Sequence, residues 1–467
     1  MQHEHVGPNI VYLPMELHMN IRHKLITDLE TTISQLRSLR LVCKLFDTVW
    51  SPIVLVNMTL FTGYYPTHHV NRLFDIVRGK STTAAFTTTL TLRNWEFLEF
   101  SWSFWILRNP WHYLRLDTLR RFKECIRARR YASVLPDKLQ LPHLRCVRLF
   151  FPRSKSNWAT YQLTRMLATF PQLTELELTT ATNVDMAYVA QCLKPLRGLR
   201  KLKLAIVCVR RVKDLPHPVP EINYFGRFIA DNHNLTHLTL RFSHARKFNL
   251  SEFFLDVPSN RPLILEHVSC NDNCRNFEAL LPHIQSLSSF EFQCDRPTGN
   301  TWCTTLSNAR IFPPTITAHF LDPQLTMYLK KHPAIVGLSL FGESATISTI
   351  ESDGLCSILA QHSATLQYLK ITSANLALML RTLQNELNFK QCKNLREIVL
   401  TRALWERDEP YHETRVLPVL AHLDCSLKVV LQVRVATFDA CVEFCRKSDD
   451  TFVCNLAGRL VLEPLAT

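Results

Sequence analysis

Glycine is scarce in this sequence, with 10 residues among 467, and the glycines stand far apart. No two are closer than Gly337 and Gly342, so the chain has no G-x-G-x-x-G loop to bring its backbone near a pyrophosphate. These two glycines have the spacing of a phosphate-binding loop, but Glu343 follows where such a loop needs lysine. Because a carboxylate there would repel phosphate, nucleotide binding at this position is excluded.

Motifs for metal binding and nucleophilic catalysis are also missing. The 15 cysteines include no C-x-x-C pair, and neither Cys270/Cys274 nor Cys441/Cys445 has a histidine pair at zinc-finger spacing. Neither G-x-S-x-G nor H-E-x-x-H occurs. We therefore expect reduced, buried cysteines, no metal or other cofactor, and no catalytic residues.

Long apolar runs and a secretory signal are absent as well. No stretch reaches the length of about 18 uncharged apolar residues that a membrane span needs. The first residues lack a basic region followed by an apolar core. These absences predict a soluble protein of the cytoplasm, the nucleus or both, with no membrane partner and with residues 1–10 as a flexible N-terminus.

The sequence is rich in a repeated L-x-x-L-x-L pattern, in which other apolar residues replace some of the leucines. Nine copies begin at Leu144, Leu173, Leu199, Leu235, Leu265, Leu287, Ile335, Leu366 and Leu395. A weak last copy begins at Leu427, and the long interval before Ile335 predicts a degenerate copy near Ile316. Segments with helical apolar spacing lie between the copies, for example Val184–Leu196, Ile222–Ala230 and Phe277–Ile284.

A short strand and a helix that recur about every 30 residues are typical of leucine-rich repeats. One such unit cannot bury its apolar face, so successive units stack. The sequence therefore predicts an α/β fold over residues 141–467: a leucine-rich-repeat solenoid with parallel strands on its concave face and helices on its convex face. We expect the stack to be irregular, because the asparagine that usually bridges successive turns occurs only at Asn273.

Residues 53–140 are less regular, and we interpret them as divergent first repeats and linking helices. Val54–Val56 and Leu90–Asn94 are candidate strands. The aromatic residues between Trp95 and Trp111 are typical of a core or of a cap on the end of a solenoid. The net charge of +14 and the basic stretch Arg115–Arg130 leave a nucleic-acid-binding scaffold open as an alternative. A solvated helix face explains that stretch more simply, because no aromatic platforms alternate with its charges.

Residues 11–52 carry two short blocks of a different kind. The first reads Leu13-Pro-Met-Glu-Leu17 with Ile21 after it, and the second reads Leu39-Arg-Leu-Val-Cys-Lys-Leu-Phe46. This segment resembles the F-box, whose pattern is L-P-x-E-[LI]-x-x-x-I at its start and L-R-L-V-C-[KR]-x-[FW] at its end. The arrangement is similar to F-box proteins with C-terminal leucine-rich repeats, a common type in filamentous fungi.

The resemblance implies a substrate-recognition subunit of a Skp–cullin–F-box (SCF) E3 ubiquitin ligase. In that role the F-box docks on a Skp-type adaptor, which hangs from a cullin scaffold, and the solenoid holds a substrate protein for ubiquitination without catalysing any reaction. The residues that match the adaptor-binding positions are Leu13, Pro14, Leu17, Ile21, Leu41, Val42 and Phe46. A non-ligase scaffold that binds protein or nucleic acid is the alternative function.

The residues on either side of the fourth position of each L-x-x-L-x-L copy are expected to face outward from the sheet. They place an acidic pair, Glu175 and Glu177, between basic positions on both neighbouring strands. Either these charges neutralise one another across the sheet, or the cations recognise an acidic or phosphorylated segment of the substrate. The candidate substrate-binding residues are Arg148, Glu175, Glu177, Lys201, Lys203, His237, Tyr368 and Lys370.

Overall fold

The computed structural model describes a set of segments and leaves the rest of the chain undescribed. The described residues are 51, 55–60, 83–92, 141–151, 164–181, 186–207, 223–243, 248–293, 301–319, 321–341, 349–373, 392, 394–403, 428–435, 438–446 and 452–457. The chain divides into two compact units, residues 51–286 and residues 287–467 together with 1–50. The predicted F-box, residues 11–52, lies outside the described residues except for Ser51, as do the segments 95–111 and 115–130.

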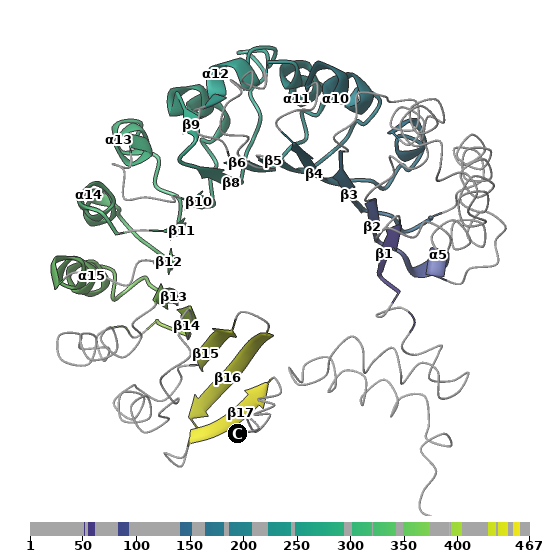
Figure 1. Cartoon of the computed structure of the whole chain (residues 1–467). Coiled ribbons are helices and arrows are strands. Elements are labelled where there is room, and N and C mark those ends of the chain that lie inside the picture. The colour runs from purple at the N-terminus through teal and green to yellow at the C-terminus, as the bar shows by residue number, and fades with distance from the viewer. Residues whose placement is uncertain are drawn as a thin grey trace, which may run out of the picture. The chain divides into compact units, whose positions relative to one another are not determined.

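The unit of residues 51–286 is built on parallel strands that follow one another in chain order (Figure 1). They are β1 (Asn57–Leu60), β2 (Thr89–Leu92), β3 (Cys146–Phe150), β4 (Glu175–Ala181), β5 (Lys201–Val207), β6 (His237–Ser243) and β8 (His267–Asn271). Helices α10 (Met186–Leu193), α11 (Phe225–Asp231) and α12 (Leu250–Phe253) pack side by side along one side of these strands. The short helix α5 (Thr83–Phe86) precedes β2, and β7 (Phe248–Asn249) pairs with β9 (Cys274–Arg275) in a separate small sheet. The predicted α/β arrangement of parallel strands and helices is confirmed for this unit.

The leucine pattern sets the register of the strands. We number the residues of each L-x-x-L-x-L copy from 1 to 6, so that position 4 is Val147 in β3 and Leu176 in β4. The position-4 residues pair directly across neighbouring strands, from Leu90 to Val147, Leu176, Leu202, Leu238 and Val268. Side chains at positions 4 and 6 are buried, whereas those at positions 3 and 5 of β4, β5 and β6 keep contact with solvent. Alternation along each strand therefore buries one face and leaves the other polar.

The backbone at position 2 joins each repeat to the next. The carbonyl oxygen of Arg145 accepts hydrogen bonds from the amides of both Thr174 (3.0 Å) and Glu175 (2.9 Å). The carbonyl of Thr174 accepts in the same way from Arg200 and Lys201, and that of Arg200 from Thr236 and His237. The same pair of hydrogen bonds to one carbonyl recurs where the strands of this unit begin. It therefore fixes the register of each repeat against the next at the first residue of the strand.

The first strand differs from its prediction. β1 begins at Asn57, after the predicted Val54–Val56, and it pairs Met58 with Leu90 of β2. The carbonyl of Val56 accepts from Thr88 and Thr89, as expected for a residue at position 2. The first copy is therefore Leu55-Met58-Leu60, in which Leu55 and Met58 are buried. The second predicted strand, at Leu90, is confirmed as β2.

Two asparagines link the C-terminal end of β6 to the end of β8 and to the residues that follow it. The amide group of Asn271 accepts from the backbone nitrogen of Phe242 (3.3 Å) and donates to its carbonyl (2.9 Å). The side chain of Asn273 donates to the same carbonyl. The bridging role expected of Asn273 is therefore confirmed, and Asn271 shares it.

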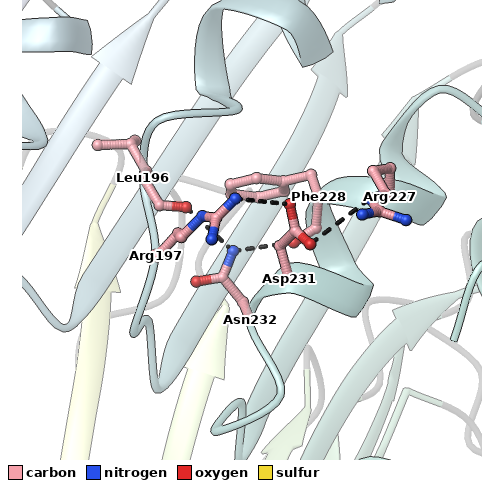
Figure 2. A network of polar contacts seen from close by, with 6 residues as sticks. All are labelled: Leu196, Arg197, Arg227, Phe228, Asp231 and Asn232. Carbon is pink, nitrogen blue, oxygen red and sulfur yellow. Dashed lines mark hydrogen bonds and ion pairs between the residues drawn. The ribbon is translucent and has the colours of Figure 1, made fainter. Parts of the chain in front are cut away.

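A buried asparagine at the end of α11 bonds to the backbone of neighbouring segments on the helical side of the unit (Figure 2). Asn232, 1% exposed at the end of α11, accepts from the amide of Leu199 (3.0 Å) and donates to the carbonyls of Leu196 (3.2 Å) and Phe228 (2.8 Å). Gly198 turns the chain between Leu196 and Leu199 with φ of +78°, a conformation that favours glycine. The side chain thus joins α11 to the loop that enters β5, because it satisfies three backbone groups buried between them.

The unit of residues 287–467 repeats the same plan with β10 (Ser289–Gln293), β11 (Thr315–Ala318), β12 (Gly337–Phe341), β13 (Tyr368–Ser373), β14 (Glu397–Ala403) and β15 (Lys428–Val435), all parallel. The degenerate copy predicted near Ile316 is confirmed as β11, and the weak copy at Leu427 as β15. Helices α13 (Thr301–Asn308), α14 (Pro323–Lys331) and α15 (Thr349–Gln361) precede β11, β12 and β13. Trp302 of α13 lies against Phe290, with ring centroids 4.7 Å apart, and both side chains are buried.

The parallel repeats do not continue to the C-terminus as predicted. β16 (Phe438–Arg446) and β17 (Phe452–Ala457) pair antiparallel with their neighbours. Only residues 436 and 437 separate β15 from β16. A two-residue connection permits a hairpin but not a parallel crossover, which needs a dozen residues or more.

Histidines take the place of Asn232 in later repeats. His332, at the C-terminal cap of α14, is 1% exposed; its Nε2 lies 3.0 Å from the carbonyl of Pro313, and its Nδ1 accepts from the amide of Ala334 (3.2 Å). His362, after α15, places Nε2 2.9 Å from the carbonyl of Leu329. The segment Phe277–His283 (η4) forms a 3₁₀ helix around Pro282, in place of the helix predicted there, and His283 accepts from the amide of Leu263. Each histidine satisfies backbone groups at a junction between elements.

Candidate functional site: the polar strand face

The polar strand face of residues 51–286 consists of the position-3 and position-5 side chains of β3 to β6. At position 3 the register sets Cys146, Glu175, Lys201 and His237 side by side. At position 5 it sets Arg148, Glu177, Lys203 and Thr239 side by side. Six of the eight candidate substrate-binding residues therefore lie together on consecutive strands, as their spacing in the sequence predicted.

Ion pairs connect the charges on this face. Glu177 lies between two cations, with one carboxylate oxygen 3.1 Å from Arg148 Nε and the other 3.6 Å from Lys203 Nζ. Glu175 pairs with Lys201 at 2.8 Å. The side chains of Lys201 and Glu175 are 50% and 36% exposed, so solvent screens the attraction and each such pair contributes about 1 kcal/mol or less. Three cations on this face thus already hold carboxylates of the same sheet.

His237 is the half-buried neighbour of Lys201. Its Nδ1 lies 2.9 Å from the hydroxyl of Thr236, and its ring lies against that of His267 on β8, with centroids 5.6 Å apart. Burial, with a further contribution from the charge of Lys201, lowers the pKa of His237 below its usual value. The imidazole is therefore neutral at pH 7 and offers this face a polar surface without charge.

Five positions expected to face solvent are buried instead: Cys146 and Ser269 in this unit, and Gly337, Ser339 and Val399 in the other. Cys146, at position 3 of β3, is 7% exposed, and burial together with Glu177 and Glu175 raises its pKa to about 11. Ser269, at position 5 of β8, is 1% exposed, and its hydroxyl has no hydrogen-bond partner in the described part of the chain. All five positions correct the expectation from strand alternation, which predicts the face of a side chain but not what neighbouring side chains cover.

The remaining candidates, Tyr368 and Lys370, belong to the other unit, on β13. Tyr368 lies opposite Glu397 of β14, and burial, followed by the charge of that carboxylate, raises the pKa of its hydroxyl. The ammonium of Lys370 lies 5.2 Å from the ring centroid of Phe341 on β12, a cation–π distance. These two residues form a local cluster of their own, and the eight candidates are divided between the two units.

Sequence reasoning missed Arg145 and Arg200, which precede β3 and β5. Both are exposed, and neither has an ion-pair partner among the described residues. The signal was present in the sequence, because both stand at position 2 of their copies. Alternation along a strand predicts the exposed face only for positions 3 to 6, and position 2 precedes the strand.

The described segments show neither a cluster of metal ligands nor a membrane-spanning helix. In these segments no group of three or more histidine, cysteine, aspartate or glutamate side chains is arranged to hold a metal ion. No described helix combines the length and the hydropathy that crossing a membrane requires. The seven candidate adaptor-binding residues, from Leu13 to Phe46, lie outside the described residues.

No protein-family model matches the chain. No curated protein matches it either.

Proposed function

We propose that this protein is the substrate-recognition subunit of an SCF-type E3 ubiquitin ligase. The observation that carries the proposal is the presence of both F-box blocks, Leu13–Leu17 and Leu39–Phe46, ahead of a chain of strand–helix repeats. The parallel strands support the second half of this arrangement, since a repeat stack offers a long side-chain face for another protein.

In this role the chain performs no bond chemistry of its own. Residues 11–52 bind the Skp-type adaptor, and the repeats bind the substrate protein. Holding a substrate lysine close to a charged conjugating enzyme raises its effective concentration, so proximity and orientation are the whole contribution of this subunit.

The polar strand face around Glu177 is the proposed substrate surface of residues 51–286. Its cations already pair with Glu175 and Glu177. An acidic substrate segment therefore binds there by exchanging partners with these glutamates. Such an exchange favours selectivity over raw affinity, because the pairs that form replace pairs that break.

The first prediction tests the adaptor half of the proposal. Replacing Leu13 and Pro14 with alanine should abolish co-purification of a Skp-type adaptor with the full-length chain, because both residues match the adaptor-contacting block of the F-box. The matched control is Leu255→Ala with Pro258→Ala, which removes the same two side-chain types from an exposed loop of residues 51–286. Adaptor yield should be unchanged in the control.

Two results would count against the proposal. An adaptor yield of the Leu13/Pro14 variant equal to that of the wild type would remove the F-box assignment. Adaptor binding without any cullin in the same pull-down would leave a scaffold that holds the adaptor outside a ligase.

A further inference from the structure

In the unit of residues 51–286, a carboxylate lies between two cations at two places. At position 5, Glu177 of β4 lies between Arg148 of β3 and Lys203 of β5 and contacts both. On the helical side of the same unit, Asp231 lies between Arg197 (3.6 Å) and Arg227 (3.5 Å), as Figure 2 shows. A carboxylate between two cations therefore occurs both on the strand face and on the helical side of this unit.

Position 2 has the two cations but lacks the carboxylate. Arg145 precedes β3, Arg200 precedes β5, and between them Thr174 precedes β4. The shared backbone bonds from Arg145 to Thr174 and from Thr174 to Arg200 fix this order. Because neighbouring strands are about 4.8 Å apart, the two arginine backbones are about 10 Å apart. Across that distance both guanidinium groups can bind the same anion, which then lies between them.

Among the described residues, the acids of the neighbouring strands are already engaged or lie further along the sheet. Glu175, the next residue of β4, has its carboxylate 2.8 Å from Lys201. Asp231 is shared between two arginines. Glu266 is the next acid along the position-2 row, but it precedes β8, two strands beyond Arg200. Lys194, exposed in the loop that enters β5, adds a further cation without an ion-pair partner among the described residues.

We infer that the strand-entry edge formed by Arg145, Thr174 and Arg200 is a docking site for an acidic segment of a partner protein. A carboxylate of that segment takes the place beside Thr174 that Glu177 takes at position 5. The hydroxyl of Thr174 donates a hydrogen bond to it. This inference goes beyond the proposed function, because it requires neither residues 11–52 nor the adaptor.

A nucleic acid fits this edge less well. The cations span three strands, and the negative charge of Glu266 ends the row. The position-2 residues between Val56 and Glu266 are Thr88, Arg145, Thr174, Arg200 and Thr236, so the row offers bases no aromatic side chain to stack on.

The test uses the full-length chain and a fluorescein-labelled peptide with three consecutive glutamates in a Gly-Ser background, followed by fluorescence anisotropy. The variant Arg145→Glu with Arg200→Glu should bind the peptide at least about tenfold more weakly, because it loses two charge-assisted contacts and adds repulsion. The matched control, Arg261→Glu with Arg275→Glu, makes the same charge change at exposed arginines of the same unit and should bind as the wild type does. Arg145→Gln with Arg200→Gln provides a second variant without added repulsion, and circular dichroism confirms that each variant is folded.

Equal weakening in both glutamate variants would overturn the inference, because it would show attraction by net charge alone. Failure of the wild type to bind the peptide would overturn it as well. A phosphoserine version of the peptide and an oligothymidylate form the remaining arms. Binding of either at Arg145 and Arg200, when the glutamate peptide does not bind there, would assign the edge to a phosphate group and not to a carboxylate. Adaptor co-purification should be unchanged in every variant, so failure here is distinct from failure of the proposed function.

Discussion

Single buried polar residues hold the helical side of each unit together. Asn232 and His332 occupy the same place, the C-terminal cap of a helix, and each satisfies backbone groups of neighbouring segments. An asparagine amide keeps its donors and acceptor at every pH, whereas an imidazole loses its acceptor when it gains a proton. The choice between the two residues therefore leaves the fold unchanged but alters its response to acid.

His332 makes the stability of residues 287–467 dependent on pH. Burial is the main cause that lowers its pKa to about 4, from about 6.5 in an unfolded chain, and the nearby His362 acts in the same direction. The unfolded chain therefore binds more protons between these values, so the stabilisation is complete above pH 6.5 and is lost as the pH falls towards 4. The loss between pH 7 and pH 5 should be about 2 kcal/mol from this residue.

Urea denaturation at pH 7 and pH 5 measures this dependence. The variant His332→Asn carries the cap found at Asn232 and removes the titration, so its unfolding free energy should fall by about 2 kcal/mol less than that of the wild type. An identical fall in both proteins would show that His332 stays neutral in the unfolded chain or is charged in the folded one.

At the scale of the element, the charges of β3, β4 and β5 act on stability and binding together. Lys201 and Lys203 each lie opposite a glutamate of β4. Replacing both lysines with glutamate places like charges side by side, which should lower the unfolding free energy by about 1 kcal/mol in total. The same change should weaken substrate capture from a lysate while adaptor binding remains, because the F-box is untouched.

The charge swap Glu175→Lys with Lys201→Glu is the control for this prediction. It restores an ion pair of reversed direction, so its stability should match that of the wild type. If the lysine double variant keeps its full substrate profile, the polar strand face is not the substrate surface. The strand-entry edge at Arg145 and Arg200 then becomes the first place to search.

At the scale of the whole molecule, the prediction from the sequence is one cooperative stack from about residue 54 to the C-terminus. The two units follow one another closely along the chain, because η4 ends at His283 and β10 begins at Ser289. Repeats that contact only their neighbours unfold together when each interface is strong. We therefore expect a single calorimetric transition and no pair of stable fragments in limited proteolysis. Stable fragments cut near residue 215, 286 or 300 would contradict this expectation.

The apolar spacing was sufficient to predict the repeats themselves. Leu176, Leu202 and Leu238 pair across the strands as their positions in the sequence require, and Glu177 lies between Arg148 and Lys203. Ile316 marks a strand even though its copy is degenerate. Such features depend on which face of a short segment is apolar, and that property is local to the sequence.

The first strand was predicted at Val54–Val56, a few residues too early, whereas the first copy is Leu55-Met58-Leu60 with methionine at position 4. The antiparallel end of the second unit was also missed, although the two residues between β15 and β16 permit no other direction. In both cases the information was in the sequence, but its meaning depended on where the neighbouring strand begins.

The sequence by itself determined which face of each strand is apolar, because apolar periodicity reports the face of a single element. Only the tertiary structure decided that Cys146 and Ser269 are covered, that Lys201 and Lys203 have partners, and that Arg145 and Arg200 do not. Burial by a neighbour and pairing of charges depend on side chains from different strands. Their distances follow from the register that the position-2 carbonyls set between repeats, and no single segment of the sequence contains that register.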